Sequence, residues 1–194
     1  MIKIIEKSYI KVYNRYIRVI FLVWRIEMGF LSKLLGKEDK KIEELVINSY
    51  MKGKVVAITE VPDPVFSQKM MGDGFAIIPE EGKLLSPVSG EIIQVFPTKH
   101  AFGIKTGDVE LLIHVGLETV AMKGEGFDVL VSAGDKVEVG QALLTYDLEL
   151  VKEKAKDIIT PCVVTNMDIV EDISVLKLNE TVDFSQEVAK IKLK

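Results

Sequence analysis

Short apolar runs, separated every few residues by glycine, proline, aspartate or asparagine, fill the sequence from about residue 46 to its end. Strands this short, with turn signals this closely spaced, are typical of an all-β sandwich or barrel. The runs are VVAI, FAII, KLLSPV, EIIQVF, FGIKT, VELLIHV, DVLV, ALLTYDL, CVVTN and VAKIKLK. Two stretches depart from this pattern: residues 147–157 predict one short helix, and residues 61–70 predict a helical turn.

Composition and charge narrow the classes of protein that remain. The chain has 194 residues, 48% of them hydrophobic, which is enough for one domain with a sizeable core and an extension. A formal net charge of -4 gives no support to nucleic-acid binding. The single cysteine, Cys162, cannot form an intrachain disulfide and stands in an apolar segment. We therefore expect a small buried residue and a reducing, cytoplasmic environment.

Residues 1–44 are expected to be an extension and linker in front of one domain at residues 45–194. The apolar stretch VIFLVW near the start is six residues long, whereas a membrane-spanning helix needs about 20. Two interpretations compete for residues 1–27: a basic amphipathic arm that touches a membrane, or an over-extended start with the protein beginning at Met28. We favour the second. Residues 29–36 predict an amphipathic helix, either at the inner face of the membrane or packed on the domain.

The two histidines of the chain, His100 and His114, are the strongest candidates for chemistry. Side chains alternate between the two faces of a strand, so residues 109, 111, 113 and 115 face the core together. His114 then lies on the opposite face, with space beside it at Gly116. By the same rule, His100 shares a face with Phe96, Thr98, Phe102 and Ile104.

A hairpin turn is predicted at Gly107–Asp108, between the strands that carry the histidines. Each histidine lies about seven residues from Gly107, which predicts that they face each other, with Cβ atoms about 4.5–5.5 Å apart. Such a pair could be hydrogen-bonded structural residues, two zinc ligands, or a nucleophile with an orienting partner. Zinc needs a third ligand, and there is no third histidine. Any zinc bound there would be adventitious or completed by an acid or a partner protein.

Several longer motifs occur in order along residues 45–194: VPDPVFSQKMMGDGFAI, SPVSGEI, HAFGIKT, ELLIHVGLETVAMKGEGF, GDKVEVG and LVKEKAKDIITPCVVTNMD. This region resembles the glucose-family enzyme IIA of the bacterial phosphoenolpyruvate-dependent sugar phosphotransferase system. The resemblance implies a distorted antiparallel β-sandwich of the duplicated hybrid motif type. It also implies a phosphocarrier that accepts a phosphoryl group from phospho-HPr and passes it to a cysteine of a sugar-specific enzyme IIB domain, with no cofactor required.

The family's motifs imply roles for four residues. The H-x-G motif makes His114 the phosphoacceptor, reacting through Nε2 while the backbone carbonyl of Gly116 holds Nδ1. The H-A-F motif makes His100 the group that stabilises the phosphoryl oxygens, and Thr98 the hydroxyl that orients His100. Imidazole is nucleophilic near pH 7, and phosphoryl transfer requires mainly alignment and charge stabilisation.

The resemblance also implies the partners, which are HPr and an enzyme IIB/IIC permease of the glucose, N-acetylglucosamine, sucrose or β-glucoside type. We expect an exposed apolar ring with acidic neighbours to bind them. The candidates for the apolar ring are Phe66, Met70, Met71, Phe96, Phe102, Ile113 and Val115, of which strand alternation would bury the last two. The acidic candidates are Asp63, Asp73 and Glu118. The chain departs from its relatives at residues 48–54, where they usually have A-P-x-x-G.

Two other classes of function are compatible with this kind of fold. A zinc metallopeptidase of the lysostaphin type needs an H-x(3)-D and an H-x-H motif, and the sequence has neither. A regulatory binding module would use the same face as the phosphocarrier, because phosphorylation would turn an apolar face into a doubly charged one.

Overall fold

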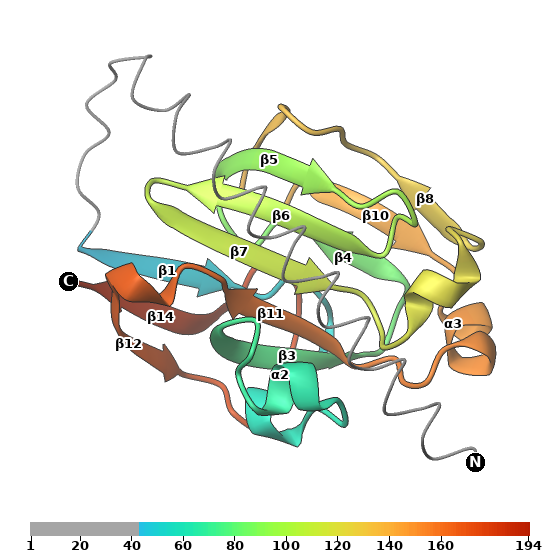
Figure 1. The fold of residues 1–194 in the computed structure, drawn as a ribbon, viewed down its shortest axis with the longest axis horizontal. Coiled ribbons are helices and arrows are strands. Elements are labelled where there is room, and N and C mark those ends of the chain that lie inside the picture. Colours follow the sequence, from blue (N-terminus) through green and yellow to red (C-terminus); the bar gives the residue numbers. More distant parts are fainter. Residues whose placement is uncertain (1–42) are drawn as a thin grey trace, which may run out of the picture. The chain divides into compact units, whose positions relative to one another are not determined.

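Antiparallel strands are the main regular structure of residues 43–194, the part of the chain that the computed structural model describes (Figure 1). The strands are β1 (Glu44–Asn48), β2 (Gly53–Ala57), β3 (Asp73–Pro79), β4 (Lys83–Leu85), β5 (Gly90–Val95), β6 (Ala101–Thr106), β7 (Val109–His114), β8 (Phe127–Val129), β9 (Lys136–Val137), β10 (Ala142–Tyr146), β11 (Thr160–Val164), β12 (Val170–Val175), β13 (Thr181–Val182) and β14 (Glu187–Leu193). The arm expected at residues 1–27, the helix expected at residues 29–36 and their membrane contact lie outside the described residues.

The described strands form three sheets. The largest has the order β13-β2-β3-β11-β7-β6-β5-β9, and the smaller ones have the orders β1-β14-β12 and β4-β10-β8. The predicted all-β class is therefore confirmed. Four of the strands, β1, β9, β12 and β13, were not among the predicted runs. Strands β9, β12 and β13 are each very short or interrupted by charged residues and lack a continuous apolar run, whereas β1 precedes the first of the predicted runs.

Both predicted helical segments are present and begin at an aspartate. The helix α3 (Leu148–Lys154) follows Asp147, whose side chain accepts a hydrogen bond from the Leu150 N–H at 3.0 Å. The helical turn α2 (Pro64–Ser67) follows Asp63, whose side chain accepts from the Val65 N–H at 2.8 Å. Aspartate caps satisfy N–H groups that have no partner inside the helix.

The eight-stranded sheet places different side chains of β7 on its two faces. Val109, Leu111 and Ile113 belong to the main hydrophobic core and are at most 2% exposed. Leu112 and His114 lie outside that cluster, so the alternation predicted from the sequence is confirmed. The strand therefore ends by presenting a histidine on the face away from the main core.

The predicted hairpin turn at Gly107–Asp108 joins β6 to β7 (Figure 1). Gly107 has φ +55°, a left-handed conformation that tight hairpin turns require and that glycine adopts without strain. Thr106 pairs with Val109 on either side of the turn. The turn thereby fixes the register of the two strands that carry the histidines.

The predicted pairing of His100 with His114 is wrong by one residue. The register places Ala101 opposite His114, and His100 lies just before β6 begins. The backbone carbonyl of His100 instead accepts a hydrogen bond from the Val115 N–H at 2.7 Å. Lys99, with φ +60°, turns the chain immediately before His100, so strand alternation does not govern that side chain.

Candidate functional site

The two imidazole rings meet although their backbones are offset. Their centroids are 4.7 Å apart and their planes cross at 71°. His114 is the last residue of β7 and is partly exposed, whereas His100 is 4% exposed. The site therefore combines one histidine that solvent can reach with one that is almost fully covered.

A backbone carbonyl determines the tautomer of His114. Its Nδ1 lies 2.7 Å from the carbonyl oxygen of Gly116. A carbonyl can only accept, so Nδ1 carries the proton and Nε2 keeps its lone pair. Burial lowers the pKa of His114, although the Gly116 carbonyl and the charge of Asp63 oppose this shift. The result is a neutral ring with a nucleophilic Nε2 near pH 7.

Glycine is required at position 116 on two grounds. Its φ is +67°, in the left-handed region. A Cβ placed there would stand 2.8 Å from Thr119 Cγ2 and 3.0 Å from the carbonyl oxygen of Asp157. Any side chain would therefore displace the peptide whose carbonyl faces His114.

A hydroxyl, rather than a carbonyl, contacts His100. Thr98 Oγ1 lies 2.6 Å from His100 Nδ1, and a hydroxyl can either donate to this nitrogen or accept from it. Burial, and then the nearby His114, lower the pKa of His100 to about 3. The ring is thus neutral near pH 7. When Nδ1 accepts the Thr98 proton, Nε2–H is free to donate toward whatever binds at His114.

Each imidazole is also in edge contact with a phenylalanine. Phe66, in α2, lies 5.5 Å from the His114 ring, and Phe96 lies 5.5 Å from the His100 ring. Aromatic pairs at this separation attract weakly and restrict ring rotation. These contacts fix the planes of both histidines.

The residues of the expected apolar ring differ in how much of each side chain reaches the surface. Met70 is 44% exposed, and Met71 and Phe96 are partly exposed. Phe66 is buried, at 5% exposed, because its ring packs against His114, so its expected place in an exposed ring is wrong. Phe102 is 0% exposed and belongs to the main core, so its expected place in an exposed ring is wrong. The reason is the backbone turn at Lys99, which separates the face of His100 from the face of Phe102.

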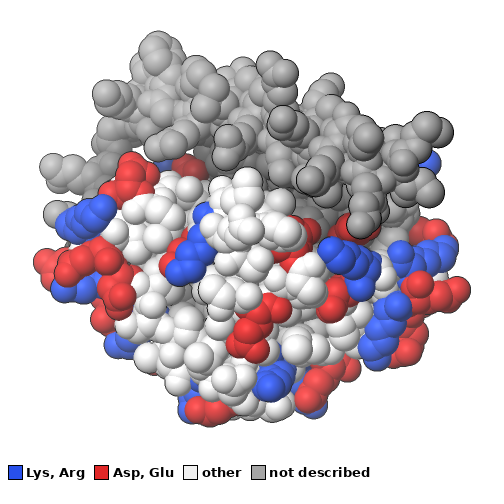
Figure 2. Space-filling view, turned by 60° about the horizontal axis from the view of Figure 1, so that its bottom comes forward, with Lys and Arg blue, Asp and Glu red and all other residues white. Residues whose placement is uncertain are grey.

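Uncharged side chains occupy much of the centre of the face that comes forward when the α2 edge of the molecule is turned to the viewer (Figure 2). Acidic and basic side chains gather mostly toward its periphery. An uncharged centre within a charged border is a common arrangement at protein interfaces.

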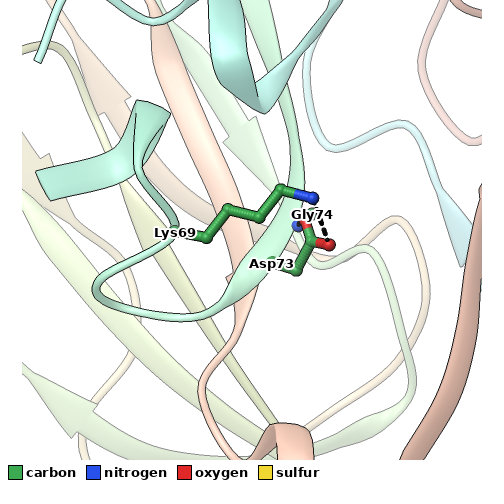
Figure 3. A network of polar contacts seen from close by, with 3 residues as sticks. All are labelled: Lys69, Asp73 and Gly74. Atoms are coloured by element: carbon green, nitrogen blue, oxygen red, sulfur yellow. Dashed lines mark hydrogen bonds and ion pairs between the residues drawn. The ribbon is translucent and has the colours of Figure 1, made fainter. Parts of the chain in front are cut away.

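The three expected acidic residues have different local partners. Asp63 caps α2 and lies close enough to His114 to affect its pKa. Asp73 accepts from the Gly74 N–H and forms a 2.8 Å ion pair with Lys69 (Figure 3). Glu118 is exposed and lies 4.0 Å from Lys156 Nζ. Asp63 is the one of these whose charge acts on the histidine pair.

The structure gives limited support for metal binding by His100 and His114. Within residues 43–194 no group of three or more His, Cys, Asp or Glu side chains is arranged to hold a metal ion. His100 and His114 would supply two ligands through Nε2, because both Nδ1 atoms already have partners. Zinc takes three or four protein ligands.

Among these same residues, no helix is both long enough and apolar enough to cross a membrane.

Sequence reasoning did not identify the residues that hold the segment after His114. Thr160 Oγ1 accepts from the Gly116 N–H at 3.3 Å, and Thr119 Oγ1 donates to the Val115 carbonyl at 2.8 Å. Thr160 lies 44 residues from Gly116. No local spacing indicates such a contact, because it depends on the pairing of β11 with β7.

Several known proteins are similar to this chain in sequence and fold. Residues 45–170 match the family described as phosphoenolpyruvate-dependent sugar phosphotransferase system, EIIA 1. The PTS system glucose-specific EIIA component of Halalkalibacterium halodurans is 60% identical over 139 residues, which cover 71% of this chain and 80% of that protein. The component of the same description from Bacillus cereus is 52% identical over 164 residues, covering 84% and 99%. The solved structure of glucose permease IIA from Mycoplasma capricolum has a TM-score of 0.70 and 37% identity, covering 77% of this chain and 96% of that one.

Proposed function

The chain belongs to the EIIA 1 family of the phosphoenolpyruvate-dependent sugar phosphotransferase system and is one of its phosphocarrier components; from this premise we propose that His114 is the residue that carries the phosphoryl group. The observation that supports this assignment most directly is the 2.7 Å contact between His114 Nδ1 and the Gly116 carbonyl. It leaves the Nε2 lone pair available on a neutral, partly exposed ring.

The proposed reaction consists of two transfers of one phosphoryl group. His114 Nε2 attacks the phosphorus of phosphohistidine in HPr, so that the new N–P bond forms as the old one breaks and the HPr imidazole leaves. A thiolate of an enzyme IIB cysteine then attacks the same phosphorus, and His114 leaves with its Nδ1 proton in place. Throughout, the Gly116 carbonyl stabilises the positive charge that develops on the phosphorylated ring.

His100 is proposed to act on the transferring group rather than to accept it. In the tautomer proposed for transfer, its Nδ1 accepts a hydrogen bond from the Thr98 hydroxyl, 2.6 Å away, and the ring proton is on Nε2. This Nε2–H donates to a phosphoryl oxygen and stabilises the charge on the group in transit. A neutral donor is sufficient here, in agreement with the pKa of about 3.

The partners follow from the family. An EIIA component exchanges phosphoryl groups with HPr and with a IIB/IIC sugar permease. We propose a glucose-type IIB domain as the acceptor, because the curated relatives are described as glucose-specific. N-acetylglucosamine, sucrose and β-glucoside permeases are the alternatives to compare in the same assay. We propose the cytoplasm, or the inner face of the membrane, as the location of this chain, because it would meet HPr and the IIB domain of a permease there.

Two secondary roles are compatible with the same face. Zinc could be shared by His100 and His114 with a partner that supplies the remaining ligands, and no cofactor is needed for the transfer itself. Regulatory proteins could recognise the face and respond to its change from uncharged to doubly negative.

The decisive experiment is incubation with phosphoenolpyruvate, enzyme I and HPr, followed by intact mass measurement. The wild-type protein should gain one phosphoryl group, and His114→Ala should gain none. His100→Gln is the matched control and should still be labelled. Full labelling of His114→Ala would refute the assignment of the phosphoacceptor.

A further inference from the structure

The three residues that follow His114 have every backbone N–H and C=O group hydrogen-bonded, although they lie beyond the end of β7. The Val115 N–H donates to the His100 carbonyl at 2.7 Å, and the Val115 carbonyl accepts from Thr119 Oγ1 at 2.8 Å. The Gly116 N–H donates to Thr160 Oγ1 at 3.3 Å, and the Gly116 carbonyl accepts from His114 Nδ1 at 2.7 Å. The Leu117 N–H donates to the Asp157 carbonyl at 2.8 Å, and the Leu117 carbonyl accepts from the Lys156 N–H at 3.0 Å. The segment is therefore held in one conformation without being part of a strand.

Thr160 has the most constrained hydroxyl in this set of bonds. Its side chain is 0% exposed, and its Oγ1 donates to the Ile158 carbonyl at 3.1 Å. With its proton used there, the hydroxyl offers only lone pairs to the Gly116 N–H. The Thr160 carbonyl accepts from the hydroxyl of Tyr50, a fully buried residue, at 2.8 Å. Thr160 thus connects the core to the peptide that precedes the Gly116 carbonyl.

Gly116 joins two peptide planes, so the contact of Thr160 with the first plane affects the position of the second. The plane before it is held by Thr119 at the Val115 carbonyl and by Thr160 at the Gly116 N–H. The plane after it is held by Asp157 at the Leu117 N–H and carries the carbonyl that faces His114. Glycine has no Cβ to limit rotation about φ. Loss of the Thr160 contact would let the first plane turn and would move this carbonyl relative to Nδ1.

We propose that Thr160 is a positioning residue for phosphoryl transfer: through the Gly116 peptide, it keeps the proton of His114 on Nδ1 and so reserves Nε2 for the phosphoryl group. The inference rests on the proposed role of His114 as phosphoacceptor. It predicts an effect on the tautomer of His114 in the unphosphorylated protein, which can be measured without any partner. Outer-shell groups that orient metal-ligating histidines typically contribute about 10-fold to 100-fold to function, and we expect an effect at the lower end of this range for His114.

The test compares Thr160→Val, which removes the hydroxyl at similar size, with Thr160→Ser, which keeps it. Nitrogen NMR of the unphosphorylated proteins reports which ring nitrogen of His114 carries the proton. We expect one Nδ1–H tautomer in wild type and Thr160→Ser, and a mixture in Thr160→Val. Phosphoryl transfer from phospho-HPr should slow roughly tenfold in Thr160→Val and recover in Thr160→Ser. Phosphorus NMR should detect some Nδ1-linked phosphate in Thr160→Val alone.

Ser86→Ala is the matched control for a general loss of stability. Like Thr160, Ser86 is buried, at 1% exposed. Its hydroxyl donates to the carbonyl of Val88, two residues away, at 2.7 Å. Its loss should lower the melting temperature without altering the His114 tautomer. If Thr160→Val does not fold, Thr160→Cys takes its place, because a thiol is a weak acceptor of similar size.

The outcomes separate this inference from the proposed function. An unchanged tautomer and rate in Thr160→Val, or an equal change in Ser86→Ala, would overturn the role of Thr160 while leaving His114 as phosphoacceptor. Wild-type protein that gains no phosphoryl group would overturn the proposed function, and the tautomer measurement would still decide whether Thr160 orients the ring.

Discussion

His100 and His114 are the same residue type, 4.7 Å apart, yet their Nδ1 atoms meet different partners. His114 faces a carbonyl, which accepts and cannot donate, so its proton has one position. His100 faces a hydroxyl, which can do either, so its proton can move between the two ring nitrogens. The comparison suggests why the proposed nucleophile and the proposed stabilising residue are not interchangeable: one needs a permanent lone pair on Nε2, and the other needs a proton there.

The largest expected effect comes from removing the second histidine. His100→Gln should accept a phosphoryl group but deliver it to enzyme IIB about a hundredfold more slowly, because a flexible amide replaces the imidazole that Thr98 and Phe96 hold in position toward the transferring group. The measurement is the rate of phosphate transfer from preloaded protein to a purified IIB domain. Delivery at the wild-type rate would remove the proposed difference between the two rings.

The next effect acts on the carbonyl that fixes His114. Gly116→Ala forces a Cβ to 2.8 Å from Thr119 Cγ2, whereas Gly134→Ala places one where no atom lies within 4 Å. Both positions have positive φ, +67° and +94°, so backbone strain largely cancels in the comparison. We expect Gly116→Ala to lower the free energy of unfolding by about 2 kcal/mol more than Gly134→Ala does. Equal denaturation midpoints would mean that the loop adapts freely.

A smaller effect concerns the pH dependence of stability. The pKa of His100 falls to about 3 on folding from its ordinary value of 6.5, and that of His114 is also lowered. Because the unfolded state then binds more protons, the contribution of these rings is present above pH 6.5 and declines as the pH falls below it. Each additional proton that the unfolded state binds changes the free energy of unfolding by about 1.4 kcal/mol per pH unit.

Urea titrations between pH 6.5 and 5.5 can measure this decline before most carboxylates titrate. His100→Gln should show a shallower loss of stability with falling pH than the wild type. Parallel profiles for the two proteins would indicate that His100 is accessible to protons in the folded state.

The smallest effect lies at the rim of the site, where exposed charge and exposed apolar surface can be compared. Met70→Asp introduces a charge at a side chain that is 44% exposed, whereas Glu118→Gln removes one that is paired at 4.0 Å with Lys156. Exposed ion pairs contribute about 0–1 kcal/mol. We expect Met70→Asp to weaken HPr binding more, as measured by calorimetric titration at fixed salt. A larger loss for Glu118→Gln would favour an electrostatic interface over an apolar one.

The sequence was sufficient to predict those features that depend on neighbours along the chain. The two-residue turn at Gly107–Asp108, the outward position of His114 and the capped helix after Asp147 all follow from local patterns. The short strand β13 did not, because two residues carry too little pattern.

The features that could not be predicted depend on single backbone angles or distant pairing. The left-handed turn at Lys99 shifts the expected pairing of the histidines by one residue and separates Phe102 from them. A lysine in that conformation has no sequence signal comparable to glycine. The contact of Thr160 with Gly116 is equally hidden, since it appears only once β11 has joined β7.

The hairpin of β6 and β7 also bears on the order in which the protein becomes functional. His114 ends this hairpin and His100 directly precedes it, so both histidines lie within one local stretch of the chain. The groups that hold the Gly116 peptide, Asp157 and Thr160, are synthesised more than 40 residues later. A growing chain therefore contains both histidines well before it contains the groups that hold the Gly116 peptide.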